Sequence, residues 1–273
     1  KCHYCGYQRK APEQCPQCQS RDLYMRGIGT QRIEEELHAL FPGVPAVRMD
    51  MDTTRGRHGH DAILTRFGRG EFQILLGTQM VAKGLDFPRV TLVGVISADS
   101  ELLFPDFRAG ERTFQLLTQV AGRAGRKDKE GEVVIQTYTP DHYSLFYVRS
   151  HDYEHFFKAE LKDRRELDYP PFSRMINILF RGPREEAVVR VSRQYAEGLQ
   201  PQTCFRMLGP VPATLSKIEN NFRYQILLIS SKQNDPGGQK TREAVRGAMA
   251  QFKERHRSRE VQVSIDVDPT SIL

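Results

Sequence analysis

The feature that most constrains the fold is an alternation of apolar segments and amphipathic helical segments between residues 30 and 138. Phe72–Leu76 and Val90–Ile96 are continuous apolar runs, which are typical of strands buried on both faces of a parallel sheet. Arg112–Ala121 instead carries its apolar residues at helical spacing. This alternation predicts an α/β unit with a doubly wound parallel sheet. The other elements expected here are a helix from Thr30, capped by the Thr30 hydroxyl and ended by Pro42-Gly43, a strand at Val47–Asp50, a helix at Ala62–Phe67 and a strand at Val133–Tyr138.

The last 120 residues or so follow a different pattern. Residues 151–167 predict a highly charged amphipathic helix with Tyr153, Phe156, Phe157 and Leu161 facing inward, and Tyr169-Pro-Pro-Phe172 ends it. The order predicted after this break is strand, helix, strand, strand, helix, strand, which is the βαββαβ order of a ferredoxin-like domain. These six elements are expected at Met175–Phe180, Glu185–Leu199, Met207–Leu208, Tyr224–Ile229, Thr241–His256 and Val261–Asp266.

Four of the five cysteines form two Cys-x-x-Cys pairs, Cys2/Cys5 and Cys15/Cys18. The segment around them, residues 1–26, has too few apolar residues to bury a core and needs another source of stability. Because no secretory leader precedes the pairs, metal binding is favoured over disulfides, and two such pairs supply the four thiolates of a tetrahedral zinc site. The alternative is reduced thiols or a redox pair. Cys204 is expected to be an ordinary buried or half-buried thiol.

The charge balance points weakly to a polyanionic partner. The net charge is +6 and the isoelectric point is about 9.1, which favours contact with nucleic acid without requiring it. The sequence has no run of about 18 apolar residues, so no membrane partner is expected. The chain starts at Lys1, one residue before a cysteine pair, and we expect it to be a piece of a longer protein.

A second set of candidate residues lies in Gln-Val-Ala-Gly-Arg-Ala-Gly-Arg, residues 119–126. On a helix, Gln119, Arg123 and Arg126 share one face, and the small residues between them leave that face uncrowded. Two guanidinium groups that converge on one point suit the charge on a γ-phosphoryl group in transfer. The alternative is a solvated basic helix end, but glycines at 122 and 125 weaken a helix, and a solvated face would not need them.

The third candidate is the segment that follows the strand Phe72–Leu76 and reads Gly-Thr-Gln-Met-Val-Ala-Lys-Gly-Leu-Asp-Phe. Ligands of open α/β sheets bind at the carboxyl ends of the strands, where this segment begins. A plain connection from strand to helix is the alternative. The residues expected to contact a nucleotide or a nucleic-acid backbone here are Gly77, Thr78, Gln79, Lys83, Gly84 and Asp86.

Together the last two segments resemble motifs V and VI of superfamily 2 helicases, in their usual order and separation. Further stretches narrow the resemblance to the primosomal replication-restart DNA helicases (the PriA family), and it covers essentially the whole chain. These stretches are Gly29-Thr-Gln31, Arg48-Met-Asp-Met-Asp-Thr-Thr54, Ala98–Ala109, Tyr169–Phe172, Gly209-Pro-Val-Pro-Ala213 and the ending Asp266-Val-Asp-Pro269.

The resemblance implies a RecA-like second helicase lobe with a cysteine-rich zinc module and a C-terminal ferredoxin-like domain. In that family the module binds two Zn²⁺ ions through eight cysteines in interleaved pairs. Cys2/Cys5 and Cys15/Cys18 would then belong to different sites, whereas their spacing alone predicts one four-cysteine site; both readings stay open. The domains expected are a partial zinc module at 1–26, helicase lobe 2 at 27–150, a connecting helix at 151–168 and a DNA- and partner-binding domain at 169–273.

The resemblance also implies an ATP-dependent 3′–5′ DNA helicase (an ATP hydrolase) that recognises stalled or branched replication forks and starts primosome assembly. Arg126 would be the arginine finger, with Arg123 and Gln119 beside it. The sequence has no Gly-x-x-x-x-Gly-Lys-[Ser/Thr] loop and no Asp-Glu pair of the helicase kind, so ATP and Mg²⁺ would bind through a first lobe that this chain lacks. We therefore expect the chain alone to be inactive.

Contacts to DNA are expected in both halves of the chain. Thr78 and the Asp99–Arg108 loop are candidates in the helicase lobe, although Asp99, Phe107 and Arg108 could equally be scaffold. In the C-terminal domain Lys217, Arg223, Tyr224 and Gln225 combine basic and aromatic groups that suit single-stranded or branched DNA, with a solvated strand end as the alternative. The partners implied by the resemblance are single-stranded and forked DNA, the acidic tail of single-strand-binding protein and other primosome proteins, in the bacterial cytoplasm and associated with the nucleoid.

Two other functions compete with this interpretation. A non-enzymatic zinc-ribbon protein that binds nucleic acid or assembles complexes would account for the cysteines and the charge, but not for the Gln119, Arg123 and Arg126 face. A helicase lobe from a repair or recombination enzyme of the same superfamily would lack the cysteine pairs and the Tyr-Pro-Pro-Phe segment.

Overall fold

The computed structural model describes residues 13–21, 29–50, 59–78, 87, 89–122, 131–199, 203–255 and 260–272. By its internal contacts the chain divides into two units. We call Ala11–Asp99 together with Arg112–His151 the N-terminal unit, and Ser100–Glu111 together with Asp152–Leu273 the C-terminal unit. Each unit is therefore discontinuous in sequence. Within the described ranges no helix is long and apolar enough to cross a membrane.

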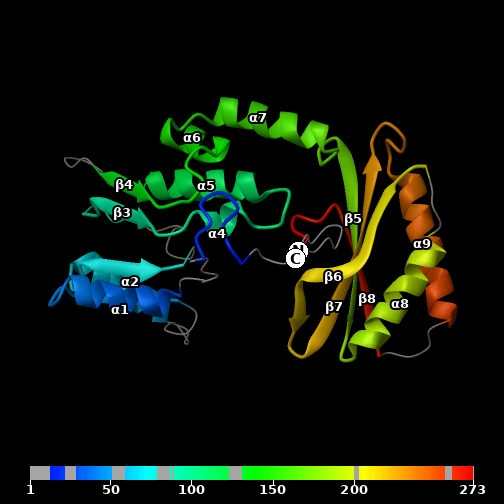
Figure 1. Cartoon of the computed structure of the whole chain (residues 1–273), viewed down its shortest axis with the longest axis horizontal. Coiled ribbons are helices and arrows are strands. Elements are labelled where there is room, and N and C mark those ends of the chain that lie inside the picture. Colours follow the sequence, from blue (N-terminus) through cyan, green and yellow to red (C-terminus); the bar gives the residue numbers. More distant parts are fainter. Residues whose placement is uncertain are drawn as a thin grey trace. The chain divides into compact units, whose positions relative to one another are not determined.

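The N-terminal unit is built from parallel strands joined by helical connections. β1 (Ala46–Met49) pairs in parallel with β2 (Ile74–Gly77), and β3 (Leu92–Val95) pairs in parallel with β4 (Glu132–Ile135). Parallel neighbours need a crossover, and helices supply both of them. This confirms the predicted α/β character of the unit (Figure 1). The helices of this unit are α1 (Thr30–Leu40), α2 (Gly59–Arg69), α6 (Tyr143–Arg149) and most of α5 (Ala109–Ala121). The short helix α4 (Asp99–Leu102) lies mainly in the C-terminal unit.

Two expectations for this unit are wrong. The two strands expected to be buried on both faces are not, since Leu92 on β3 is 60% exposed and every residue of β2 is only partly buried. The side chain of Thr30 does not cap α1, because its hydroxyl donates to Asp50 Oδ2 at 3.0 Å and the cap position is occupied by Gly29. The Thr30 hydroxyl therefore bonds to the buried Asp50 carboxylate and not to the amides at the start of α1.

The connecting helix predicted at 151–167 is α7 (Tyr153–Glu166), with Asp152 as its cap through a 3.1 Å hydrogen bond from the His155 amide to Oδ1. Phe156 is buried as expected. Tyr153 and Phe157 were predicted to face inward, but both are exposed and stack on each other, with their ring centroids 6.1 Å apart. Periodicity therefore identified the helix but overestimated the width of its buried face.

The C-terminal unit contains a four-stranded antiparallel sheet with the order β6-β7-β5-β8. The helices α8 (Glu185–Gly198) and α9 (Gln239–Arg255) both cover one face of it, as Figure 1 shows. The six elements follow one another as strand, helix, strand, strand, helix, strand, which is the predicted order. The strands are β5 (Ser173–Gly182), β6 (Arg206–Ile218), β7 (Asn221–Ser231) and β8 (Gln262–Val267).

Side-chain alternation gives this sheet two different faces. On the helix side, Ile178, Phe180 and Ile226 are fully buried and form the main core with α8 and α9. On the opposite face, a smaller apolar cluster covers one end of the sheet and includes Met175, Leu227, Ile229 and Ile272. The sheet is therefore packed on both faces at that end, and the rest of the second face carries Leu179 and mainly polar side chains.

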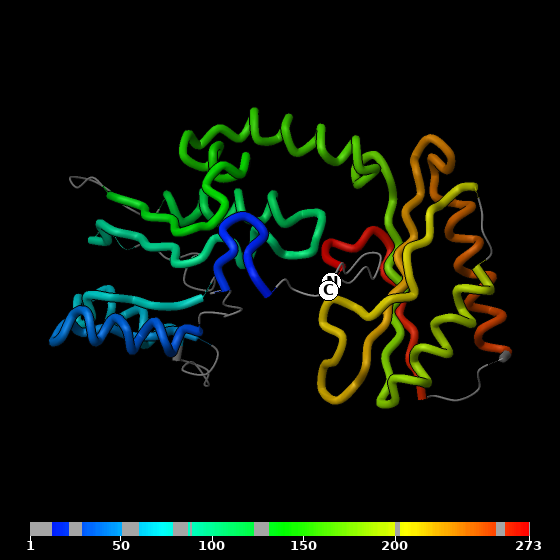
Figure 2. The backbone as a smooth tube through the Cα atoms, in the orientation of Figure 1, coloured from blue at the N-terminus to red at the C-terminus, as the bar shows by residue number. Residues whose placement is uncertain are grey.

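β6 is much longer than the two residues predicted for it. It runs for 13 residues beside β7, with register shifts between Leu208 and Val211 and between Pro212 and Lys217, and the hairpin is traced in Figure 2. The prolines at 210 and 212 are tolerated because β6 is an edge strand, where a missing amide does not interrupt a central ladder. Gly209 has φ +99° at the first irregularity, a conformation that side chains rarely adopt.

Candidate functional site

The carboxyl ends of β1 and β2 lie side by side, as expected for a ligand-binding edge. Met49 pairs with Gly77, so Asp50 and Thr78 leave the two strands at the same edge. Asp50 is buried, accepts the Thr30 hydroxyl and pairs with Arg48 at 3.0 Å, while Thr78 is exposed. The edge thus has a fixed polar framework with a hydroxyl free to meet solvent. Of the expected contacts, Gln79, Lys83, Gly84 and Asp86 lie outside the described residues.

The helix expected to present the arginine face is α5. Its buried side contains Phe114 at 4%, Leu117 at 1% and Val120 at 9% exposure, whereas Gln119 is exposed on another side. This places Gln119 where it can meet a ligand without disturbing the packed side of the helix. The remaining members of the predicted face, Arg123 and Arg126, lie outside the described residues.

Asp99, a candidate DNA contact, is fully engaged within the N-terminal unit. Its carboxylate accepts the hydroxyls of Thr137 and Thr139, both at 3.0 Å, and the amide of Tyr138 at 3.1 Å. Burial raises the pKa of this carboxyl, but the hydrogen bonds from residues 137–139 together outweigh burial and lower the pKa. Of the two roles left open for Asp99, this geometry supports the scaffold, since the carboxylate holds the turn after β4.

Arg108, in the same sequence motif, lies in the C-terminal unit. Its Nε is 3.4 Å from Glu111 Oε2, and its guanidinium lies 5.9 Å from the ring centroid of Phe107. Phe107 in turn stacks on Tyr169 at 5.6 Å. The loop is therefore a packed element, and Arg108, which is only partly buried, keeps some access to solvent.

The structure separates the four residues predicted to bind DNA in the C-terminal unit. Lys217 is exposed and lies 4.6 Å from the ring centroid of Phe222, and Tyr224 donates to Glu185 at 2.8 Å, so both belong to the helix side. Arg223 and Gln225 point to the opposite face and are only 8% and 1% exposed. Gln225 is therefore a core residue in this conformation, and the structure gives no support to a direct DNA contact there.

The sequence reasoning missed Arg181. On β5 it pairs across the strands with Arg223 on β7 and with Gln262 on β8, so the three form one polar row on the face opposite the helices. Arg181 is 40% exposed and donates to Glu219 at 3.0 Å, and Arg223 donates to the Leu215 carbonyl at 3.2 Å. Burial, followed by the charge of Arg181, lowers the pKa of Arg223. Extending the alternation of the predicted strand by one residue would have found Arg181.

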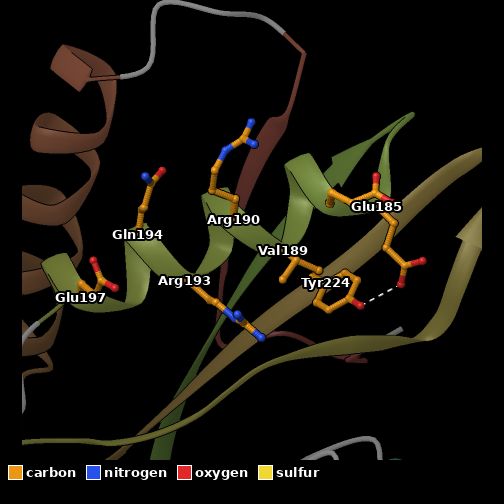
Figure 3. A pocket seen from close by; sticks show the side chains of 8 residues that line it. Glu185, Val189, Arg190, Arg193, Gln194, Glu197 and Tyr224 are labelled. Atoms are coloured by element: carbon orange, nitrogen blue, oxygen red, sulfur yellow. Dashed lines mark hydrogen bonds between the residues drawn. The ribbon is translucent and has the colours of Figure 1, made fainter.

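A surface groove of about 550 Å³ runs along the outer side of α8 (Figure 3). Burial raises the pKa of Tyr224 to about 12, and the hydrogen bond to Glu185 adds to this effect. The groove is lined by three glutamates and two arginines, so it favours neither an anion nor a cation. Its lining residues are Glu185, Glu186, Val189, Arg190, Arg193, Gln194, Glu197 and Tyr224.

The second cysteine pair forms a tight turn. The amide of Gln19 donates to the Cys15 carbonyl at 2.8 Å, and the Cys15 amide donates to the Ser20 carbonyl at 2.8 Å. Hydrogen bonds from the Cys18 and Gln17 amides lower the pKa of Cys15, which favours the thiolate that a metal requires. This turn fits one half of a four-thiolate site. No cluster of three or more metal-ligating side chains occurs among the described residues, and Cys2 and Cys5 lie outside them.

Two family models match different parts of the chain. Residues 18–128 match the family model for the helicase conserved C-terminal domain, and residues 165–270 match the model for the primosomal protein N C-terminal domain. Replication restart protein PriA from Bacillus subtilis is 43% identical over 276 residues, covering 100% of this chain and 34% of that protein. The proteins of the same name from Synechocystis and Haemophilus influenzae are 45% and 39% identical over 84% and 100% of the chain.

The chain spans about a third of the length of these relatives, with 28% to 37% of each covered. The helicase family model covers the first part of the chain and the primosomal family model covers the last part. Parallel strand pairs with helical crossovers in the first part fit a RecA-like lobe. The chain therefore belongs to the PriA family of replication restart proteins, of which it carries the C-terminal portion.

Proposed function

We propose that the chain supplies the second motor lobe and the terminal docking domain of an ATP-dependent 3′–5′ DNA helicase that acts in replication restart. The observation that carries this proposal is the parallel β1–β2 edge with Thr78 at its carboxyl end, followed in the chain by α5 with Gln119 exposed. In such a motor, a nucleotide held by the first lobe would draw the Gln119, Arg123 and Arg126 face towards its γ-phosphate, and hydrolysis would release it. Each cycle would shift the lobes along single-stranded DNA.

The test compares this chain with the intact protein that contains it. The chain alone should hydrolyse no ATP, with or without DNA, and the intact protein should show DNA-stimulated hydrolysis. Arg126→Ala in the intact protein should lower kcat by about 10³-fold or more, as expected for an arginine finger, and leave DNA binding within about twofold. DNA-stimulated hydrolysis by the chain alone, or unchanged turnover in Arg126→Ala, would contradict the proposal.

We also propose a place for DNA on the C-terminal unit, which we assign to the ferredoxin-like fold from its element and strand order. The polar row on this face consists of the partly exposed Arg181, the exposed Gln262 and the buried Arg223, and strands β5, β7 and β8 put no aromatic side chain on this face. DNA would therefore be held through its phosphates and not by base stacking, with low sequence preference and strong salt dependence. Lys217, on the other side, would extend the basic surface around the hairpin.

A matched pair of variants tests this surface. Arg181 and Arg184 are both exposed arginines that pair with a glutamate, Glu219 for the first and Glu260 for the second. Arg181→Ala should weaken binding to single-stranded DNA and lower the slope of log K against log salt by about 1, and Arg184→Ala should change neither. Equal effects of the two substitutions would refute the sheet-face surface.

Zinc binding by the cysteine pairs is the remaining part of the proposal. Cys15 and Cys18 would hold one half of a structural Zn²⁺ site, and Cys2 and Cys5 either the other half of the same site or half of another. The thiolate-stabilising turn at Cys15 supports a role in metal binding. Metal analysis of the purified chain distinguishes the arrangements, because one tightly bound zinc per chain indicates a shared site and none indicates two incomplete sites.

The non-enzymatic zinc-ribbon alternative predicts that no nucleotide binds even when the first lobe is present. Titration of a fluorescent ATP analogue against the intact protein and against this chain separates the two functions. By resemblance, the partners of the intact protein would be forked DNA, the single-strand-binding protein tail and other primosome proteins, and it would act in the bacterial cytoplasm at the nucleoid.

A further inference from the structure

The segment Ser100–Glu111 belongs to the C-terminal unit, although the residues on either side of it in the sequence belong to the N-terminal unit. We call this segment the strap. It ends inside α5, which continues as a single helix from Ala109 to Ala121. One end of α5 is therefore part of the C-terminal unit, and the other end, with Gln119, is part of the N-terminal unit.

The turn of the strap is fixed to the end of the chain through Asp106, which is 6% exposed. Its Oδ1 accepts the Arg108 amide at 2.9 Å, and its Oδ2 accepts the Ser271 hydroxyl at 3.1 Å and the Ile272 amide at 3.3 Å. Ile272 is fully buried in the apolar cluster on the sheet, and Phe107 packs against the same cluster. The strap is thus a part of the packing of the C-terminal sheet.

The start of α5 is fixed separately, by Arg164 of α7. The Nη2 of Arg164 donates to Glu111 Oε2 at 2.8 Å and to Glu160 Oε1 at 2.6 Å, and its Nη1 donates to the Pro170 carbonyl at 3.4 Å. Burial lowers the pKa of Arg164, but its bonds to the two glutamates outweigh burial, and the pKa is raised. Glu160 is four residues before Arg164 in the same helix, whereas Glu111 is 53 residues away. The bond to Glu111 is therefore the long-range one.

Gln119 follows Glu111 by two helical turns, about 12 Å along the axis of α5. A continuous helix moves as one body, so the position of its first turn sets the position of the side chains at its other end. We propose that Glu111 and Arg164 are a positioning pair that couples the C-terminal unit to the nucleotide-facing end of α5. Neither residue touches the nucleotide in this scheme, which rests on the function proposed above. DNA held by the C-terminal unit would act on ATP turnover through this connection.

Two isosteric substitutions in the intact protein separate coupling from stability. Glu160→Gln weakens a local bond within α7, and Glu111→Gln weakens the bond that reaches α5. We expect Glu111→Gln to lower kcat of DNA-stimulated ATP hydrolysis by about tenfold, with KM for ATP and the Kd for single-stranded DNA within about twofold. Glu160→Gln should lower the melting temperature at least as much, because Glu160 makes the shorter contacts, and should leave kcat within about twofold.

Further variants keep the test decisive. Glu111→Asp retains the charge and should recover part of kcat, and Arg184→Met, which breaks an exposed ion pair of the same unit, should leave kcat unchanged. Unchanged kcat in Glu111→Gln, or losses in both glutamate variants that simply follow their melting temperatures, would overturn the coupling. Absence of DNA-stimulated hydrolysis in the unmodified intact protein would instead overturn the proposed function itself.

Discussion

Replacement of Asp235 by alanine should loosen α9 selectively. Asp235 lies four residues before the helix, is 3% exposed and accepts three hydrogen bonds. Its Oδ2 accepts the Thr241 amide at 2.9 Å and the Thr241 hydroxyl at 2.8 Å, and its Oδ1 accepts the Lys240 amide at 3.4 Å. It therefore satisfies first-turn amides that the helix itself cannot bond.

The expected loss combines two effects. Removal of a helix cap costs about 1 kcal/mol, and loss of a hydrogen bond to a charged group costs about 1.5–2 kcal/mol, so the opening of α9 should become about 2–3 kcal/mol easier. The Thr241 hydroxyl keeps its 3.0 Å bond to Ser230 Oγ, which limits the loss. This free energy corresponds to a decrease of about 30- to 160-fold in amide protection for α9.

Hydrogen exchange measured by mass spectrometry on this chain gives the result region by region. Asp235→Asn keeps one acceptor oxygen and should lose less protection than Asp235→Ala. Asp152→Ala removes an exposed cap from α7 and should lower amide protection in α7 alone. If α9 kept its protection within about twofold in Asp235→Ala, the hydrogen bonds of Asp235 would not stabilise the helix start.

Other substitutions and conditions give equally definite expectations. Gly209→Ala should destabilise the β6–β7 hairpin by about 2 kcal/mol or more, because the residue has φ +99° and a Cβ would lie 2.6 Å from the Gln225 carbonyl oxygen. Gly247→Ala, in open space on α9, should stabilise by about 0.5–1 kcal/mol, and urea unfolding of both variants checks the opposite signs. Ile272→Ala should cost about 2–5 kcal/mol, because the side chain is fully buried, and thermal unfolding by circular dichroism measures it. Because the folded-state pKa of Asp99 is lowered, its contribution to stability is present above the ordinary carboxyl pKa and should disappear as the pH falls through the lower folded value; Asp99→Asn should make acid unfolding less steep.

Hydrophobic periodicity predicted the long elements well, because their burial follows a regular repeat. Helices α5, α7 and α8 and strands β5 and β7 lie where the sequence placed them, within a few residues. The four-residue α4 and the seven-residue α6 are too short for a repeat to be recognised. β6 was predicted only at Met207–Leu208, and its edge position explains why the glycine and prolines that follow are tolerated within a strand.

The sequence could predict only those parts of the candidate site whose residues lie close together along the chain. Thr78 lies at a strand end and Gln119 on an exposed side of its helix, as motifs and periodicity predict, and their contacts to a ligand stay predictions. Arg223 and Gln225 were grouped with Lys217 by sequence proximity, but alternation along β7 puts them on the other face, where they are buried. The long-range bonds of Asp99 depend on partners 38 to 40 residues away, which no local pattern reveals.

The strap has a consequence for how the family can vary and be engineered. The apolar cluster of the terminal sheet, with Leu227 and Ile229, takes part of its cover from Phe107 in a distant piece of sequence. A chimera that exchanged only residues 165–270 between relatives would combine the sheet of one relative with the Phe107 segment of the other. A chimera that also exchanged residues 100–111 would keep the native packing between the two. Substitutions in the strap and in the apolar cluster of the sheet should therefore occur together, so that the terminal domain and residues 100–111 evolve as one packing unit.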